Sequence, residues 1–189
     1  MKISIQTRIT KNDLLVLPFY EGKSPKPTQD EALQNQHHPD FEGKLSEQVM
    51  IYQKDKISPR ILLIGLGPQD KETTETWRRA GGSLATQLKK SIQNITIIPP
   101  KENIEFVAAF AEGLLLKHYQ YEEVFTDKKR KLTKIQNLSL IIQDKKIGNA
   151  LKKQLDEIIT TTEAVHAVRD MVNAPSNKMS PSLLAKKAQ

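Results

Sequence analysis

Two glycines that follow a short apolar run are the residues best placed to do chemistry. Ile61–Ile64 is typical of a strand buried on both faces, and Gly65-Leu66-Gly67 comes directly after it. A glycine turn between a strand and a helix can hold a phosphate on backbone N–H groups. The dinucleotide-binding pattern needs a third glycine three positions later, where the sequence has Asp70, and no Walker-type loop occurs. The glycines therefore predict a tight turn, with phosphate binding as the alternative.

Histidines and carboxylates form few clusters in the sequence. His37, His38 and Asp40 lie in a polar stretch and are the one group that resembles a set of metal ligands. Adjacent histidines on an extended chain point in opposite directions, so we expect this stretch to face solvent. His118 and His166 fall at helical positions and are expected to be surface or core residues.

Nucleophiles and acid–base groups are not arranged for catalysis. Asp30-Glu31 and Glu122-Glu123 are adjacent pairs, whereas acid–base catalysis needs carboxyl groups that face each other. No nucleophile elbow or histidine pattern accompanies Ser83, Ser139 or Ser176. The sequence thus predicts no catalytic, cofactor-binding or metal-binding residue in this chain.

Composition narrows the class of protein. The 189 residues include 29 Lys+Arg against 22 Asp+Glu, a net charge of +7 that permits contact with a polyanion. The densest basic run, Lys128–Lys134, could contact nucleic acid, but it contains no aromatic residue to stack on bases. Nucleic acid is therefore the less favoured, alternative partner. The sequence has no cysteine, no signal-peptide pattern and no apolar run of membrane-spanning length. We expect a cytoplasmic protein without membrane contact.

Alternating strands and helices must position these residues. Strand patterns occupy 2–7, 13–19, 47–53, 61–64, 95–98 and 138–142, and helical periodicity occupies 73–90, 103–118 and 147–172. The polar stretch 21–46, with three prolines, is predicted to be a surface excursion with a short helix near 31–36. This order predicts an α/β fold, and two successive strands at the start predict a mixed sheet.

The first predicted helix carries two adjacent glycines. Its apolar stripe consists of Trp77, Ala80, Leu84 and Leu88, and Thr73 or Thr74 can cap it. Gly81 and Gly82 each cost about 1 kcal/mol relative to alanine inside a helix. The expected compensation is a close approach of this helix to the sheet.

The end of the chain carries a more specific pattern. Residues 164–188 resemble the junction of the leucyl (cytosol) aminopeptidase family, where an arginine–aspartate helix enters an Asn-x-Pro-x-Asn turn and a proline-led helix follows. The matching positions are Arg169, Asp170, Asn173, Pro175, Asn177 and Pro181. Segments 60–67 and 108–121 are similar to the amino-terminal domain of the same family. The resemblance covers nearly the whole chain and weakens over 21–46.

The resemblance implies a domain arrangement. Residues 1–160 would form a macrodomain-like amino-terminal domain, with a mixed β-sheet sandwiched between helices. Residues 161–189 would form a linker helix and the start of a catalytic domain. The family's metal ligands and catalytic arginine lie in that second domain, which includes an Asn-Thr-Asp-Ala-Glu-Gly-Arg stretch that this sequence lacks.

The resemblance also implies a function for the parent enzyme. That enzyme would be a homohexamer that removes amino-terminal residues from peptides with two divalent metal ions, manganese or zinc. The present chain would be its non-catalytic, structural or regulatory domain, with the catalytic domain of the same polypeptide as partner. The alternative is a free-standing macrodomain-like module that binds a nucleotide or nucleic acid.

Overall fold

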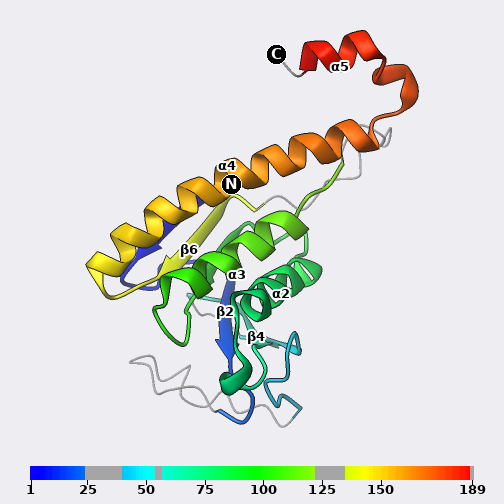
Figure 1. The fold of residues 1–189 in the computed structure, drawn as a ribbon. Helices are drawn as coiled ribbons and strands as arrows, with labels where there is room; N and C mark the ends of the chain where they lie inside the picture. Colours follow the sequence, from blue (N-terminus) through cyan, green and yellow to red (C-terminus); the bar gives the residue numbers. More distant parts are fainter. Residues whose placement is uncertain (24–39, 54–56, 122–134, 188–189) are drawn as a thin grey trace.

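A six-stranded mixed sheet forms the centre of the molecule. The computed structural model describes residues 1–23, 40–53, 57–121 and 135–187 (Figure 1). Its strands are β1 (Lys2–Gln6), β2 (Leu14–Phe19), β3 (Gln48–Tyr52), β4 (Arg60–Gly65), β5 (Asn94–Ile97) and β6 (Asn137–Ile141), in the order β1-β6-β5-β2-β4-β3. All neighbouring strands are parallel except β3, which pairs antiparallel with β4 at one edge. The predicted mixed sheet is confirmed.

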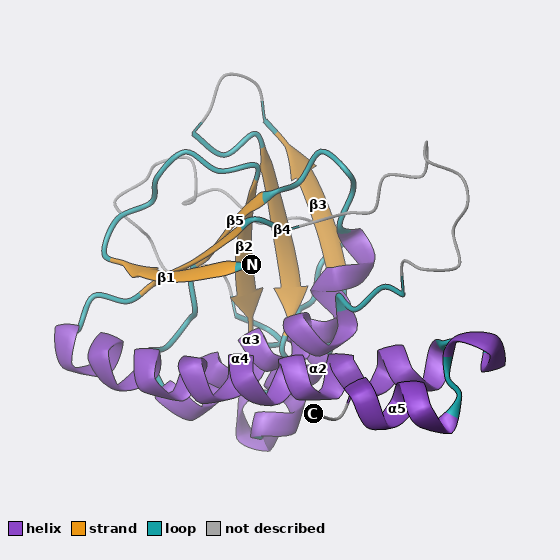
Figure 2. Ribbon diagram, turned by 90° about the horizontal axis from the view of Figure 1, so that it is seen from above, coloured by secondary structure: helices purple, strands orange, loops and turns teal. Residues whose placement is uncertain are grey.

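Helices connect the strands and cover the sheet. The helices are α2 (Thr74–Leu84), α3 (Ile104–Lys117), α4 (Lys145–Asn173) and α5 (Pro181–Lys187), with 3-10 turns at Gln69–Lys71, Ala85–Gln87 and Ser176–Lys178. Figure 2 shows α2, α3 and α4 on the same side of the sheet. The α/β class is confirmed. The predicted helix near 31–36 lies outside the described residues.

The two central strands are buried on both faces, as their apolar sequences require. β2 and β4 have almost entirely buried residues, in contrast to the half-buried edge strands β1 and β3. Pro18 is tolerated in β2 because its missing N–H faces β5, whose pairing with β2 ends at Val16 and Ile97. On the opposite side of β2, Phe19 O accepts a hydrogen bond from Leu66 N.

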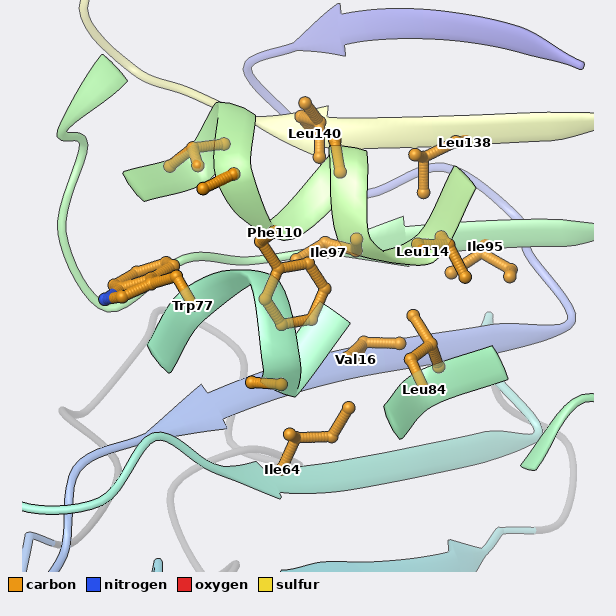
Figure 3. Close-up of a cluster of buried hydrophobic side chains, with 14 of the residues drawn as sticks. Val16, Ile64, Trp77, Leu84, Ile95, Ile97, Phe110, Leu114, Leu138 and Leu140 are labelled. Carbon is orange, nitrogen blue, oxygen red and sulfur yellow. The ribbon is translucent and has the colours of Figure 1, made fainter. Parts of the chain in front are cut away.

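Apolar side chains pack on each face of the sheet. The larger core joins one face to α2, α3 and α4, and Figure 3 shows Phe110 and Leu114 over side chains from β2, β5 and β6. Trp77 is only 1% exposed and closes one end of this core. A smaller cluster on the other face is built on Leu15, Leu17, Ile61 and Leu63. The helices therefore pack on one face within the described part of the chain.

The adjacent glycines of α2 have different environments. A Cβ at Gly81 would lie 1.9 Å from Phe110 O, whereas a Cβ at Gly82 would meet its nearest atom, Gly113 O, at 3.6 Å. A Cβ at Gly113 would lie 1.9 Å from Arg78 O. The expected approach of α2 to the sheet is therefore wrong, because the close contact is between α2 and α3. The helix also ends at Leu84, so Leu88 lies beyond it.

α4 is the longest element and extends past the body of the fold. Its amino-terminal half lies beside β1 and α3, while its carboxyl end and α5 project outward (Figure 1). Val168 and Val172, near the carboxyl end of α4, are 58% and 78% exposed. None of the helices in the described ranges is long and apolar enough to span a lipid bilayer.

Candidate functional site at the carboxyl ends of the parallel strands

The fold has one position where a ligand site is expected from topology. After β2 the chain continues to β3 and β4 on one side of it, and after β5 it continues to β6 on the other side. The neighbouring strands β2 and β5 therefore mark the point where the strand order reverses. In open α/β sheets, ligands bind beyond the carboxyl ends of such strands. The glycine turn after β4 reaches the same edge, so the loops after these three strands form the candidate site.

The glycine turn is already filled by protein backbone. The N–H groups of Gly65, Leu66 and Gly67 donate to the carbonyls of Glu47, Phe19 and Gly43, respectively. Gly67 has a φ of +76°, in the left-handed region that glycine adopts readily. A Cβ at Gly65 would lie 1.8 Å from Lys44 O. The glycines therefore allow tight packing of the 43–47 loop, and no N–H group of this turn is left for a phosphate.

A second anion-binding feature beside the turn is also occupied internally. The N–H groups of Glu42, Gly43 and Lys44 converge on Glu47 Oε2 at 3.1, 2.8 and 2.9 Å. Successive N–H groups of this kind form a concavity that binds anions. Here the anion is the protein's own carboxylate, which fixes the loop against Gly65.

Glu72 is the centre of a polar cluster at this edge. Its carboxylate accepts hydrogen bonds from Tyr20 Oη at 2.8 Å, from Trp77 Nε1 at 3.3 Å and from Lys101 Nζ. Tyr20 follows β2, Glu72 precedes α2 and Lys101 follows β5. Lys101 Nζ also lies 4.2 Å from the ring centroid of Phe106, which stacks on Trp77. The cluster ties three connections together.

The electrostatics of this cluster favour an ionised Glu72. Burial by itself raises the pKa of Glu72, but the hydrogen bonds from Lys101, Tyr20 and Trp77 and the charge of Lys101 outweigh it, so the pKa is lowered. Burial and the Glu72 carboxylate raise the pKa of Tyr20, which stays protonated as a donor. Since every polar group of the cluster has a protein partner, the arrangement is that of a structural support.

The junction residues of the sequence pattern meet at the far end of α3. Arg169 Nη1 donates to Leu116 O, and its guanidinium lies 5.5 Å from the ring centroid of Tyr119. Tyr119 Oη donates to Asp170 Oδ1 at 2.7 Å and accepts from Asn173 Nδ2 at 3.2 Å. These three residues of α4 fix its carboxyl half to the end of α3. We call this arrangement the α3–α4 clamp.

The two helical histidines lie at the same clamp. The His166 ring is 5.2 Å from that of Tyr119, and Ile135 N donates to His118 Nε2 at 3.4 Å. Burial lowers the pKa of His118, with help from the charge of His166, and burial together with Arg169 lowers the pKa of His166. The lowered pKa favours the neutral form of each ring. Both histidines are half-buried packing residues, and the sequence predicted surface or core positions for them.

The remaining candidates do not converge on this edge. Ser83 Oγ donates to Ala80 O within α2, Ser139 bonds Ser4 across β6 and β1, and Ser176 lies in a 3-10 turn. Asp40 is described and lies in a turn. His37, His38, Asp30-Glu31, Glu122-Glu123 and Lys128–Lys134 lie outside the described residues.

The described residues do not fit the two metal ions that the family resemblance implies for the parent enzyme. Within the described ranges, no group of three His, Asp or Glu side chains is placed to hold a metal ion. Glu72 already accepts three hydrogen bonds, and His118 and His166 belong to the clamp. No metal-dependent step can be derived from these side chains.

Comparison with known sequences defines the class. The fold is a mixed-sheet α/β domain whose helix α4 carries the Arg169-Asp170 pair. The sequence model of the cytosol aminopeptidase family, N-terminal domain, matches residues 16–128. This chain belongs to that family. The probable cytosol aminopeptidase of Protochlamydia amoebophila is 31% identical over 95% of the chain and 38% of the relative. The probable cytosol aminopeptidase of Clostridium perfringens is 26% identical over 97% of this chain and 39% of the relative. The chain thus spans less than half the length of these relatives.

Solved structures agree on the fold. A mutant of tomato leucine aminopeptidase superposes with a TM-score of 0.76 and 22% identity, over 98% of this chain and 41% of that one. The bottromycin maturation enzyme BotP in complex with Mn gives a TM-score of 0.66 and 18% identity, over 93% of this chain and 35% of that one. At these identities the likeness shows the fold alone.

Sequence reasoning missed both carboxylate centres. Glu72 stands directly before the helix cap Thr73, and two of its three partners are 52 and 29 residues away in the chain. The partners of Glu47 are close in sequence, but they are backbone N–H groups, which no side-chain pattern marks. Their partners come from residues 20, 77 and 101 and from residues 42–44. The one available signal was the glycine-rich stretch around 65–67, which indicated that another segment of backbone packs closely against it.

Proposed function

We propose that this chain is the non-catalytic amino-terminal domain of a cytoplasmic leucyl aminopeptidase, an exopeptidase that uses two divalent metal ions and assembles as a homohexamer. Residues 1–160 would be the folded scaffold, and 161–189 would lead into the catalytic domain. Family membership supports this proposal. The Mn in one structure of the same fold supports the metal dependence of the parent enzyme.

The α3–α4 clamp is the observation that carries the scaffold role. It fixes the carboxyl half of α4 to the domain by Arg169, Asp170 and Asn173. The same half-helix presents Val168 and Val172 to solvent, although apolar side chains on a helix normally face a partner. A rigid helix with an uncovered apolar stripe is suited to position a following domain.

The first test is direct. The 189-residue chain, supplied with manganese or zinc, is expected to release no leucine from leucyl-p-nitroanilide. A leucine-releasing activity that co-purifies with the chain and depends on added metal would contradict the proposal. The full-length enzyme that contains the chain is the positive control.

The second test addresses the scaffold role. In the full-length enzyme, Val168→Asp should lower activity at least about tenfold, because an unpaired carboxylate buried in a domain interface costs several kcal/mol. Ile57→Asp is the matched control, since Ile57 is 57% exposed and Val168 is 58% exposed, and it should leave activity unchanged. In the isolated chain both variants should unfold at the same urea concentration as the parent. Full activity of Val168→Asp would refute the scaffold role.

The alternative, a nucleotide-binding module, has lost its main support. The N–H groups of the glycine turn are engaged by the 43–47 loop and by Phe19. The basic run that suggested nucleic acid lies outside the described residues.

A further inference from the structure

A groove of about 790 Å³ runs between β1 and the amino-terminal half of α4. Figures 1 and 2 both place β1 alongside this half of the helix. Ile5 and Ile142 from the sheet and Leu155 and Ile159 from α4 give the groove an apolar lining. Its lining shares no residue with the Glu72 cluster and does not include Val168.

One wall of the groove is an open sheet edge. Within the described ranges β1 pairs with β6 alone. Lys2 N donates to Gln136 O and Gln6 O accepts from Ile142 N, so these alternate residues of β1 face β6. Because strand residues alternate, Ile3 and Ile5 direct their N–H and C=O groups toward the open edge. Unpaired backbone groups of this kind can take up another strand.

The groove is also positively charged. Lys2, Arg8, Lys145 and Lys152 are exposed lining residues, and the lining carboxylates are Asp144 and Asp156. Asp144 is engaged as the N-cap of α4, where it accepts from Lys146 N and Ile147 N. The groove therefore combines an apolar floor, backbone groups of β1 that have no strand partner in the described part of the chain, and a cationic rim.

We propose that this groove binds an extended acidic peptide segment of a partner protein, which adds as a strand to the open edge of β1. Alternate side chains of the segment would enter the apolar groove, and acidic side chains would meet the cationic rim. Strand addition of this kind takes its affinity from backbone hydrogen bonds and its specificity from the pockets for alternate side chains.

Charge decides between the occupants. A second copy of this chain would bring the same cationic rim, on a chain with a net charge of +7, against itself. A nucleic acid would satisfy the rim but not the backbone groups of Ile3 and Ile5 or the apolar lining. An acidic peptide satisfies all three features.

The probe is a fluorescein-labelled eight-residue peptide that alternates glutamate and valine. We expect saturable binding by fluorescence anisotropy. Hydrogen exchange should slow at the Ile3 and Ile5 amides and stay unchanged at Lys2 and Gln6, which already face β6. The same peptide with N-methylated valines should bind at least about tenfold more weakly, because it cannot complete the strand hydrogen bonds.

Charge reversal tests the rim. Arg8→Glu with Lys152→Glu should weaken binding about tenfold, because two exposed ion pairs with the peptide become repulsions. Lys71→Glu with Lys90→Glu changes the net charge equally on exposed residues outside the groove and should bind as the parent does. Urea unfolding checks that both variants are folded.

Three results would overturn the inference. One is the absence of binding at millimolar peptide. Another is binding that tolerates N-methylation, which would be charge attraction without strand addition. The third is displacement of the peptide by an equally charged single-stranded DNA that protects the same amides, which would make the groove a site for nucleic acid.

Discussion

Adjacent glycines in α2 offer a matched pair of substitutions with opposite expected signs. Gly81→Ala places a Cβ 1.9 Å from Phe110 O, and the obstacle is backbone, which cannot rotate away. Relief requires α2 and α3 to separate by about 1 Å or more in a closely packed core. Gly82→Ala places the same atom 3.6 Å from Gly113 O, at ordinary contact distance.

The magnitudes follow from two competing contributions. Alanine favours the interior of a helix over glycine by about 1 kcal/mol. Overpacking a core costs typically about 1–3 kcal/mol, and a backbone-to-backbone contact belongs at the upper end. We therefore expect Gly81→Ala to lower the free energy of unfolding by about 2 kcal/mol and Gly82→Ala to raise it by about 0.5–1 kcal/mol.

The assay is urea unfolding monitored by tryptophan fluorescence. Trp77 is the single tryptophan and is 1% exposed in the core beside α3, so its emission reports on this packing. The urea midpoints of the two variants should shift in opposite directions at a constant m-value. Equal destabilisation by both substitutions, or an unchanged midpoint for Gly81→Ala, would refute the assignment of the close contact to Gly81 rather than to Gly82.

Two pH dependences follow from the polar clusters. The lowered pKa of Glu72 means that its contribution to stability is present above its ordinary pKa of 4.5 and is lost as pH falls through the folded-state value. In Glu72→Gln, the unfolding temperature measured by calorimetry should therefore depend less steeply on pH below pH 5. The lowered pKa values of His118 and His166 mean that the unfolded chain takes up protons first as pH falls below 6.5. Stability should therefore decline below pH 6.5, and a joint His118→Asn and His166→Asn variant that keeps the same decline in urea titrations would count against this assignment.

The glycine turn shows how a local pattern can indicate geometry without indicating its use. The sequence predicted a strand followed by a tight turn, and both are present at Gly65–Gly67. Whether the turn holds a phosphate depends on what approaches its N–H groups. Here the 43–47 loop approaches them and accepts hydrogen bonds from Gly65 N and Gly67 N. The local sequence around the turn does not indicate these hydrogen bonds.

The sequence by itself determined the order of strands and helices, because burial on a strand or a helix face imposes periods of two and 3.6 residues that can be counted. It also determined the family, since the Arg169-Asp170 pair, Asn173 and Pro175 occur at the family's spacing. Only the tertiary structure decided that Arg169 and Asp170 clamp α4 to α3, that Glu72 joins three connections, and that Gly81 but not Gly82 is sterically required. The physical reason is that these depend on distances between residues far apart in the chain, which packing sets and local propensity does not.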